Sequence, residues 1–175
     1  MNRLTKYLTF LVLFLCLSAC DEPPKPVETP DSGQMKESLE KANRYLIHEE
    51  EEEIQDYIDR HQWTMTSTGT GLRYEIVKEG HGELIQAGQT VVMDYVLNDI
   101  KGDVIYSSKE DGQKTFTVGA GGAETGLDEA VRYLREGSVA HVILPSHLGY
   151  GLLGDQKGIP ERATLIYTIQ IVEVK

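Results

Sequence analysis

A tyrosine between two glycines, Gly149-Tyr150-Gly151, is followed after a short gap by Ile159-Pro160-Glu161-Arg162-Ala163-Thr164-Leu165-Ile166-Tyr167. Glycine adopts backbone conformations that other residues take only at a cost, so this tyrosine sits on a loop that can turn sharply. The run after Pro160 leads into a long strand of alternating residues. A large amphipathic side chain between glycines is poorly explained by core packing, and we expect Tyr150 to contact a ligand.

From residue 72 onward, short apolar strands surround a single helical segment. Alternating patterns predict strands over residues 72–77, 91–97, 103–108, 114–118, 139–144 and 164–174. Leu127, Ala130, Val131 and Leu134 have helical spacing, and Gly137 marks the end of that helix. One short helix among five or six strands predicts an α+β fold, in which a bent, mostly antiparallel sheet wraps around the helix.

The N-terminus has the pattern of an exported lipoprotein. Arg3 and Lys6 precede an apolar run over residues 7–19, which is too short to span a bilayer of about 30 Å but suits a signal peptide. The run ends in Leu17-Ser18-Ala19-Cys20, which matches the bacterial lipobox. We expect residues 1–19 to be removed as a lipoprotein signal peptide. An ordinary signal peptide with a chance cysteine is the alternative.

After cleavage, Cys20 would carry palmitate-type acyl chains that hold the protein on a membrane of the bacterial envelope, facing the periplasm. The sequence leaves open whether this is the inner or the outer membrane. Cys16 lies in the predicted signal peptide, so the mature domain has no thiol for a disulfide, a metal or redox chemistry.

Charge and histidine content exclude further classes of site. Loss of Arg3 and Lys6 with the signal peptide would change the net charge from −11 to −13. Such an acidic surface repels polyanions, so no nucleic-acid partner is expected. No metal site is predicted, because the histidines lack metal-ligand spacing; they are His48, His61, His81, His141 and His147.

Three segments precede the domain at 72–175. Residues 20–33 contain four prolines and few apolar side chains, and we expect a disordered tether. An apolar stripe in the acidic segment 34–63 predicts one helix or two abutting helices, and residues 64–71 form a Ser/Thr/Gly linker. Docking of the helix on its own domain would explain the stripe. The carboxylates of Glu49 to Glu53 favour a solvated helical face over a metal or peptide site.

Together with Gly126-Leu127-Asp128-Glu129-Ala130, the Gly149–Tyr167 region resembles the FK506-binding-protein (FKBP-type) peptidyl-prolyl cis-trans isomerases. The resemblance covers about residues 72–175. Because helical extensions dimerise some periplasmic members, it implies a homodimer through residues 34–63 as the alternative to docking. The whole layout also resembles the gliding-motility-associated isomerase lipoproteins of Bacteroidetes-type bacteria. This narrower likeness implies a role in maturing envelope or secretion proteins.

The resemblance implies an apolar pocket that binds a prolyl ring. Rotation about the amide has a barrier of about 18–20 kcal/mol and needs no nucleophile, metal or cofactor. Desolvation of the proline is enough to favour the less dipolar, twisted transition state. Tyr150 would bind the substrate carbonyl through its hydroxyl, and the backbone N–H of Glu124 would donate to the ligand. The implied pocket residues are Tyr95, Ile105, Tyr106, Phe116, Leu127, Tyr150, Ile159 and Tyr167. For Tyr95, Leu127 and Tyr167, ordinary core packing is the alternative.

Several pocket positions depart from the family pattern. Tyr106 stands where the family has an aspartate, Leu127 where it has a tryptophan, and Lys114 near an expected phenylalanine. Ala123-Glu124 replaces an apolar pair. Because a buried aromatic removes about 150–250 Å² from water, these losses predict weak macrolide binding and modest isomerase activity.

Three functions follow from these patterns. The first is a lipid-anchored rotamase that assists the folding of exported proteins, with proline-containing polypeptides as clients. The second is a chaperone or binding module that has kept the fold without turnover. The third is a structural lipoprotein of an envelope assembly.

Overall fold

The computed structural model describes residues 32–175. The predicted signal peptide, Cys20 and residues 20–31 of the predicted tether lie outside the described residues. Residues 41–175 form one compact unit, and residues 32–40 lie outside it. Along residues 32–175, no helix has both the length and the apolar character needed to cross a bilayer.

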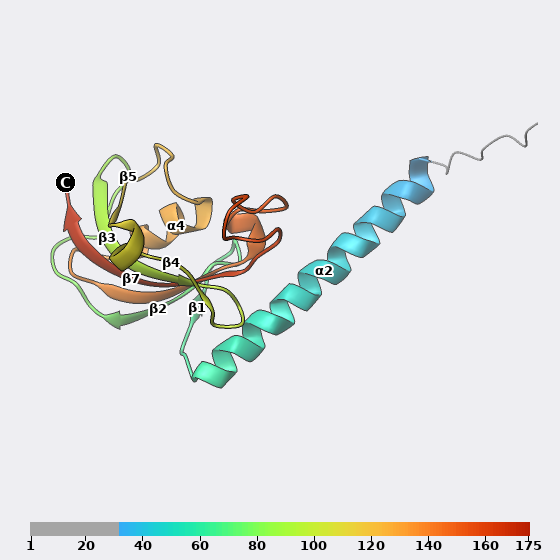
Figure 1. Cartoon of the computed structure of the whole chain (residues 1–175), viewed down its shortest axis with the longest axis horizontal. Coiled ribbons are helices and arrows are strands. Elements are labelled where there is room, and N and C mark those ends of the chain that lie inside the picture. Colours follow the sequence, from blue (N-terminus) through green and yellow to red (C-terminus); the bar gives the residue numbers. More distant parts are fainter. Residues whose placement is uncertain (1–31) are drawn as a thin grey trace, which may run out of the picture. The chain divides into compact units, whose positions relative to one another are not determined.

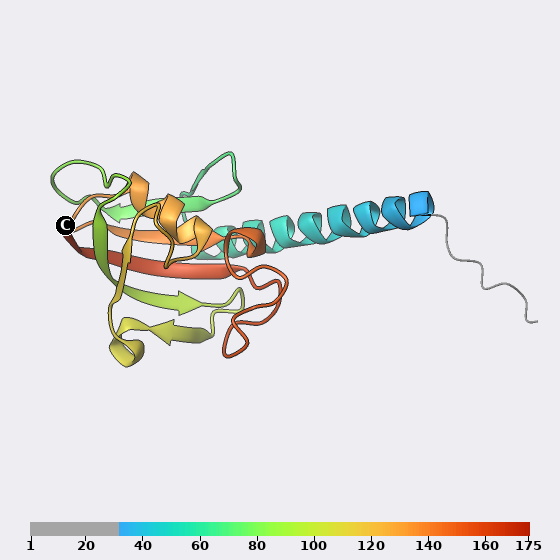
Figure 2. The ribbon, with the colours of Figure 1, turned by 90° about the horizontal axis from the view of Figure 1, so that it is seen from above.

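An antiparallel sheet forms the body of the domain and curves around a short helix, α4 (Figures 1 and 2). Its strands follow the order β1-β2-β6-β7-β3-β4, and β5 pairs with β3 off this path. The strands are β1 Thr66–Ser67, β2 Arg73–Lys78, β3 Thr90–Asn98, β4 Val104–Ser107, β5 Lys114–Thr117, β6 Val139–Leu144 and β7 Leu165–Val174. The helices are α2 Ser32–His61, α3 Ser108–Asp111 and α4 Thr125–Ala130, with 3-10 turns η1 Val131–Tyr133 and η2 Ser146–Leu148.

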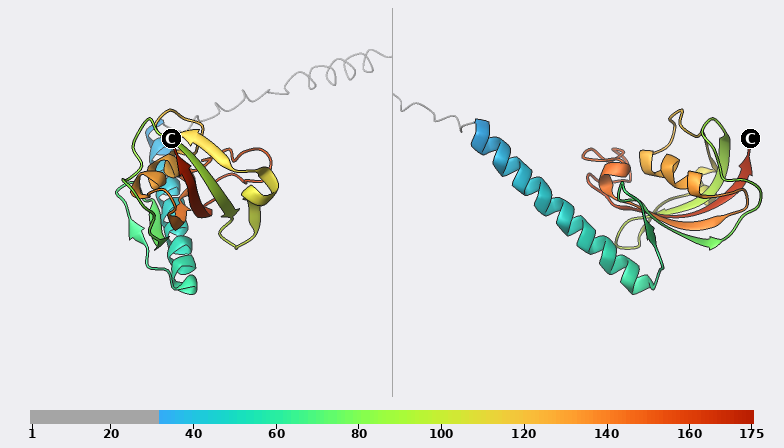
Figure 3. Two further views of the ribbon diagram at one scale, coloured as in Figure 1. Left: turned by 90° about the vertical axis from the view of Figure 1, so that its left-hand side faces the viewer. Right: turned by 180° about the vertical axis from the view of Figure 1, so that it is seen from behind.

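The predicted α+β fold is confirmed. Every predicted strand is present, and the predicted helix is α4 continued by η1. The additional strand is β1, a two-residue strand that pairs with β2 inside the expected linker at 64–71. The view from behind in Figure 3 shows α4 lying within the curve of the sheet.

The main core fills the space between α4 and the sheet. Strand residues of one parity point into it: Val142 and Leu144 from β6 and Leu165 and Tyr167 from β7 are buried there. Because successive side chains of a strand point to opposite faces, Ile143 and Ile166 must lie on the other face of the sheet.

The second half of α2 covers that other face. Ile54, Tyr57 and Ile58 are buried against Ile143 and Ile166 in a separate apolar cluster. Full burial of an aliphatic side chain contributes about 1.5–3 kcal/mol, so this cluster is enough to hold the helix in place. Docking on its own domain therefore accounts for this part of the apolar stripe.

In the first half of α2, apolar side chains of the stripe are exposed rather than buried. Met35 and Leu39 are 47% and 63% exposed, respectively. The homodimer through residues 34–63 therefore stays a prediction.

The end of α2 is closed by a Schellman motif. Gln62 takes the left-handed conformation with φ 56°, its N–H donates to Asp59 O, and the N–H of Trp63 donates to Ile58 O at 3.2 Å. The Trp63 ring stacks on His141 of β6, with centroids 4.1 Å apart. The chain's single tryptophan thus reports on the docking of the helix.

Replacing Ile54 by alanine tests this docking. We expect Ile54→Ala to lower the free energy of unfolding by about 2–5 kcal/mol, because it leaves a cavity beneath the helix. Denaturant unfolding followed by Trp63 fluorescence measures the change. The control is Ile47→Ala on the same helix, where the side chain is 50% exposed and the expected change is within about 0.5 kcal/mol. Equal stability of the two variants would contradict the docking.

Candidate active site

The side chains predicted to form the pocket all belong to one cluster. Phe116, Leu127, Ile159 and Tyr167 are buried within the main core. The half-buried members Tyr95, Ile105, Tyr106 and Tyr150 pack against the same core. The eight side chains come from β3, β4, β5, α4, β7 and the loop after η2, and each belongs to or packs against this one core.

The pairing of β3 with β7 places Tyr95 and Tyr167 on the same face of the sheet. In the antiparallel register of β3 and β7, Leu97 lies opposite Tyr167 and Tyr95 lies opposite Ile169. Tyr95 and Tyr167 therefore point to the face that carries α4, and their ring centroids are 6.1 Å apart. Tyr167 is almost fully buried, whereas Tyr95 is only half-buried.

Leu127 owes its place to the glycine that precedes it. A Cβ atom on Gly126 would lie 2.7 Å from Leu144 Cδ2 and 2.9 Å from Leu148 Cβ. Only glycine lets α4 approach β6 and η2 this closely. Leu127, the next residue, is fully buried in the main core.

Tyr106 holds the loop that carries Ile159. Its hydroxyl donates to Asp155 Oδ2 at 2.5 Å and accepts the N–H of Gly158 at 3.1 Å. The other carboxylate oxygen, Asp155 Oδ1, accepts the N–H groups of Lys157 and Ile159 at 2.9 and 2.8 Å. Tyr106 thus replaces the pocket aspartate of the family with a phenol bound to an aspartate of the opposing loop.

A buried ion pair lies among the pocket residues. Lys114 Nζ contacts both carboxylate oxygens of Glu124, at 2.7 and 2.9 Å. The Glu124 side chain is 3% exposed and that of Lys114 is 21% exposed. The hydroxyl of Tyr167 also donates to Glu124 Oε1, at 3.0 Å.

This pair was missed by the sequence reasoning, which assigned only the backbone N–H of Glu124. The available signal was that Lys114 and Glu124, both at positions where the family is apolar, carry opposite charges. One charged substitution in a pocket leaves an unpaired ion, whereas two of opposite sign can compensate each other.

The surroundings of Glu124 set the protonation of the site. Burial acts to raise the pKa of Glu124, but the Lys114 ammonium and hydrogen bonds from Lys114, Tyr150 and the residue's own N–H outweigh it, so that this pKa lies below its usual value. Burial first, and then the Glu124 carboxylate, raise the pKa values of Tyr150 and Tyr167 well above the usual value of a phenol. At neutral pH the site therefore holds a carboxylate and two neutral phenol donors.

This arrangement suits binding and desolvation rather than covalent chemistry. The predicted pocket side chains are mainly apolar members of the core, and the half-buried Tyr150 carries a hydroxyl that can donate to a carbonyl oxygen. Among residues 32–175 no group of three or more histidine, cysteine or acidic side chains is placed to hold a metal ion.

Comparison with known proteins agrees with this geometry. The family model described as FKBP-type peptidyl-prolyl cis-trans isomerase matches residues 82–172. FK506-binding protein 1 of Dictyostelium discoideum is 31% identical over 106 residues, covering 60% of this chain and 99% of that protein.

Two bacterial proteins are similar over a comparable span. The FKBP-type peptidyl-prolyl cis-trans isomerase FkpA of Escherichia coli K12 is 29% identical over 109 residues, and a probable FkpA of Neisseria meningitidis is 33% identical over 109 residues. Each match covers 62% of this chain but only 40% and 39% of the relative. With more than half of its length matched by the family model, the chain belongs to the FKBP-type peptidyl-prolyl cis-trans isomerases.

Proposed function

We propose that this isomerase acts on exported polypeptides from a lipid anchor in the bacterial envelope, and that Tyr150 binds the substrate next to its proline. The observation that supports the site assignment is that all eight side chains belong to or pack against one core, with Tyr95, Ile105, Tyr106 and Tyr150 only half-buried there.

In this mechanism the prolyl ring packs against the apolar walls, among them Phe116, Leu127 and Ile159. Loss of water around the amide stabilises the twisted, less dipolar transition state relative to the planar ground state. On binding, the Tyr150 hydroxyl exchanges its hydrogen bond to the Glu124 carboxylate for one to a flanking carbonyl oxygen of the substrate, and this bond orients the substrate. The raised pKa of Tyr150 keeps that donor protonated throughout the physiological pH range.

An anchored isomerase has a clear use in the envelope. X–Pro bonds of unfolded chains populate the cis form at about 10–30% and interconvert in tens to hundreds of seconds. Catalysis shortens a step that would otherwise limit folding. The resemblance to gliding-motility lipoproteins favours envelope or secretion proteins as clients.

A binding or chaperone module without efficient turnover is the second candidate. The buried Lys114–Glu124 pair favours it, because the pair places charge where an apolar pocket would desolvate the prolyl ring. A proline-limited refolding assay separates the two functions: acceleration supports the isomerase, and client binding without acceleration supports the module.

Removal of the Tyr150 hydroxyl tests the substrate contact. We expect Tyr150→Phe to lower kcat/KM on a proline-containing peptide by about threefold to tenfold, the effect of losing one hydrogen bond of about 0.5–1.5 kcal/mol. Circular dichroism should show an unchanged fold. The matched control is Tyr45→Phe, because Tyr45 lies on α2 and is 65% exposed. If Tyr150→Phe and Tyr45→Phe had the same kcat/KM, the substrate contact would lie elsewhere.

Removal of one member of the ion pair tests its burial. We expect Lys114→Met to lower the free energy of unfolding by about 3–5 kcal/mol, because it leaves the Glu124 carboxylate buried without a cation. The double variant Lys114→Met/Glu124→Gln should recover most of this loss, since glutamine still accepts the hydrogen bond from Tyr167. Denaturant unfolding measures both variants. A double variant no more stable than Lys114→Met would show that the unpaired charge of Glu124 does not cause the loss of stability.

Substitution of the cysteine tests the anchor. In a bacterial host fed labelled palmitate, we expect Cys20→Ala to abolish incorporation of the label and to release the protein from the membrane fraction. Cys16→Ala is the matched control and should remain labelled, because residue 16 would be removed with the signal peptide. Labelled Cys20→Ala protein would rule out this acylation site.

A further inference from the structure

We propose that Glu50 of α2 is a positioning residue for Tyr150, although it lies outside the segment matched by the family model. The carboxylate of Glu50 clasps both ends of the loop that carries Tyr150. This inference rests on the proposed role of Tyr150 in substrate binding.

Glu50 binds the first end of the loop at Ser146, where η2 begins. Ser146 donates its N–H to Glu50 Oε1 at 2.6 Å and its hydroxyl to Glu50 Oε2 at 3.1 Å. Ser146 is 8% exposed. Its N–H and hydroxyl would therefore lose their acceptor in a nearly dry position if Glu50 were removed.

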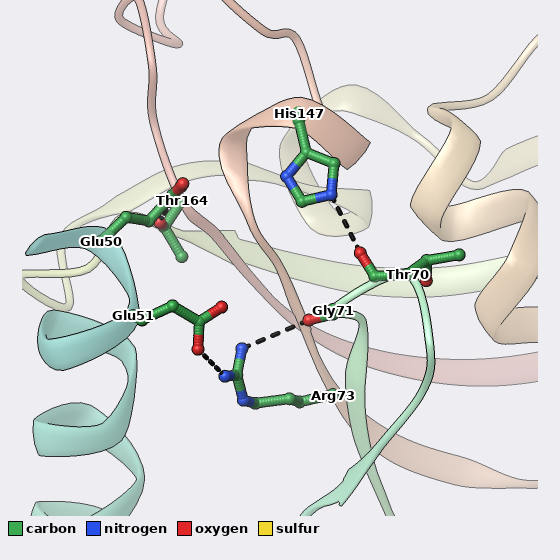
Figure 4. A network of polar contacts seen from close by, with 7 residues as sticks. All are labelled: Glu50, Glu51, Thr70, Gly71, Arg73, His147 and Thr164. Carbon is green, nitrogen blue, oxygen red and sulfur yellow. Dashed lines mark hydrogen bonds and ion pairs between the residues drawn. The ribbon is translucent and has the colours of Figure 1, made fainter. Parts of the chain in front are cut away.

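The second end of the loop meets the same carboxylate. Thr164, immediately before β7, donates its hydroxyl to Glu50 Oε1 at 2.8 Å and is 5% exposed. Figure 4 shows Glu50 on α2 beside Thr164, with Glu51 of the same helix paired to Arg73. One side chain of α2 therefore joins two chain positions that flank the Tyr150 loop.

Two backbone hydrogen bonds complete a closed circuit, which we call the Glu50 ring: Glu50, Ser146, Gly151, Arg162 and Thr164. The carbonyl of Ser146 accepts the N–H of Gly151 at 2.9 Å, and the carbonyl of Gly151 accepts the N–H of Arg162 at 2.8 Å. Arg162 leads to Thr164 through the chain. The ring fixes Gly151, the residue that follows Tyr150.

The ring also holds a backbone conformation that the loop would not keep alone. Arg162 has φ 57°, in the left-handed region that side-chained residues rarely adopt. Such a conformation persists when surrounding contacts over-determine it, and here these are the bond to Gly151 and the nearby clasp at Thr164. Without Glu50, we expect the loop to sample positions in which the Tyr150 hydroxyl no longer meets the substrate.

The test compares four variants of the full chain. Glu50→Ala removes the clasp. Glu50→Gln is the conservative rescue, because its amide oxygen can accept from Ser146 N and Thr164 Oγ1 while its amide nitrogen donates to Ser146 Oγ. Thr164→Val removes one bond at constant volume. Glu51→Ala is the matched control, because it breaks the helix contact to Arg73 but leaves the ring intact.

We expect Glu50→Ala to lower kcat/KM on a proline-containing peptide by about threefold to tenfold through misplacement of Tyr150. Amide hydrogen exchange at Gly151 and Arg162 should rise by about tenfold or more, while exchange at Thr168 and Ile169 of β7 stays unchanged. Thr164→Val should shift both readouts in the same direction by less. Glu50→Gln should restore most of the loss, and Glu51→Ala should change neither readout.

In a Tyr150→Phe background, Glu50→Ala should have no further effect on kcat/KM, because the hydroxyl that Glu50 positions is already absent. The inference is overturned if Glu50→Ala leaves kcat/KM unchanged, if Glu51→Ala has the same effect, or if exchange rises equally in β7. An inactive wild-type chain would instead contradict the proposed function, and the exchange rates would then decide whether the ring holds the loop.

Discussion

The pairing of β6 with β7 is the constraint on which the rest of the molecule depends, because both faces of this pair are buried. Val142 and Tyr167 lie opposite each other and face α4 and the pocket, whereas Ile143 and Ile166 lie opposite each other and face α2. A slip of one residue would exchange the two sets of side chains and turn Tyr167 away from the pocket. The same register therefore builds the site and docks the helix.

The predicted pocket side chains include a charged pair that the family pattern lacks. Desolvation of a carboxylate costs several kcal/mol, and Glu124 offsets that cost through Lys114 and the hydroxyl of Tyr167. The pair thereby holds Tyr167 in one orientation, but it reduces the apolar surface available to a ligand. Such a pocket suits a peptide, which brings its own carbonyl and N–H groups, better than a wholly apolar ligand.

Much of the fold could be predicted from local pattern, and much of the site could not. Alternation located the six longer strands, and helical spacing located α4, because both depend on side chains close in the chain. The pocket members came from the family resemblance, since they are apolar residues that look like core. The contacts of Glu50 with Ser146 and Thr164 span 96 and 114 positions. No local pattern predicts them, and the run Glu49 to Glu53 looked like a solvated face.

The isomerase therefore depends on more of the chain than the matched segment at 82–172. Strand β2 lies before it and pairs along β6 from Arg73 to Lys78, so a chain without β2 would expose the edge of β6. Leu72, which is fully buried in the main core, would be lost with it. Before β2 in the chain, Ile54, Tyr57 and Ile58 of α2 cover Ile143 of β6 and Ile166 of β7, which would otherwise face water. The second half of α2 is thus a structural part of the catalytic domain.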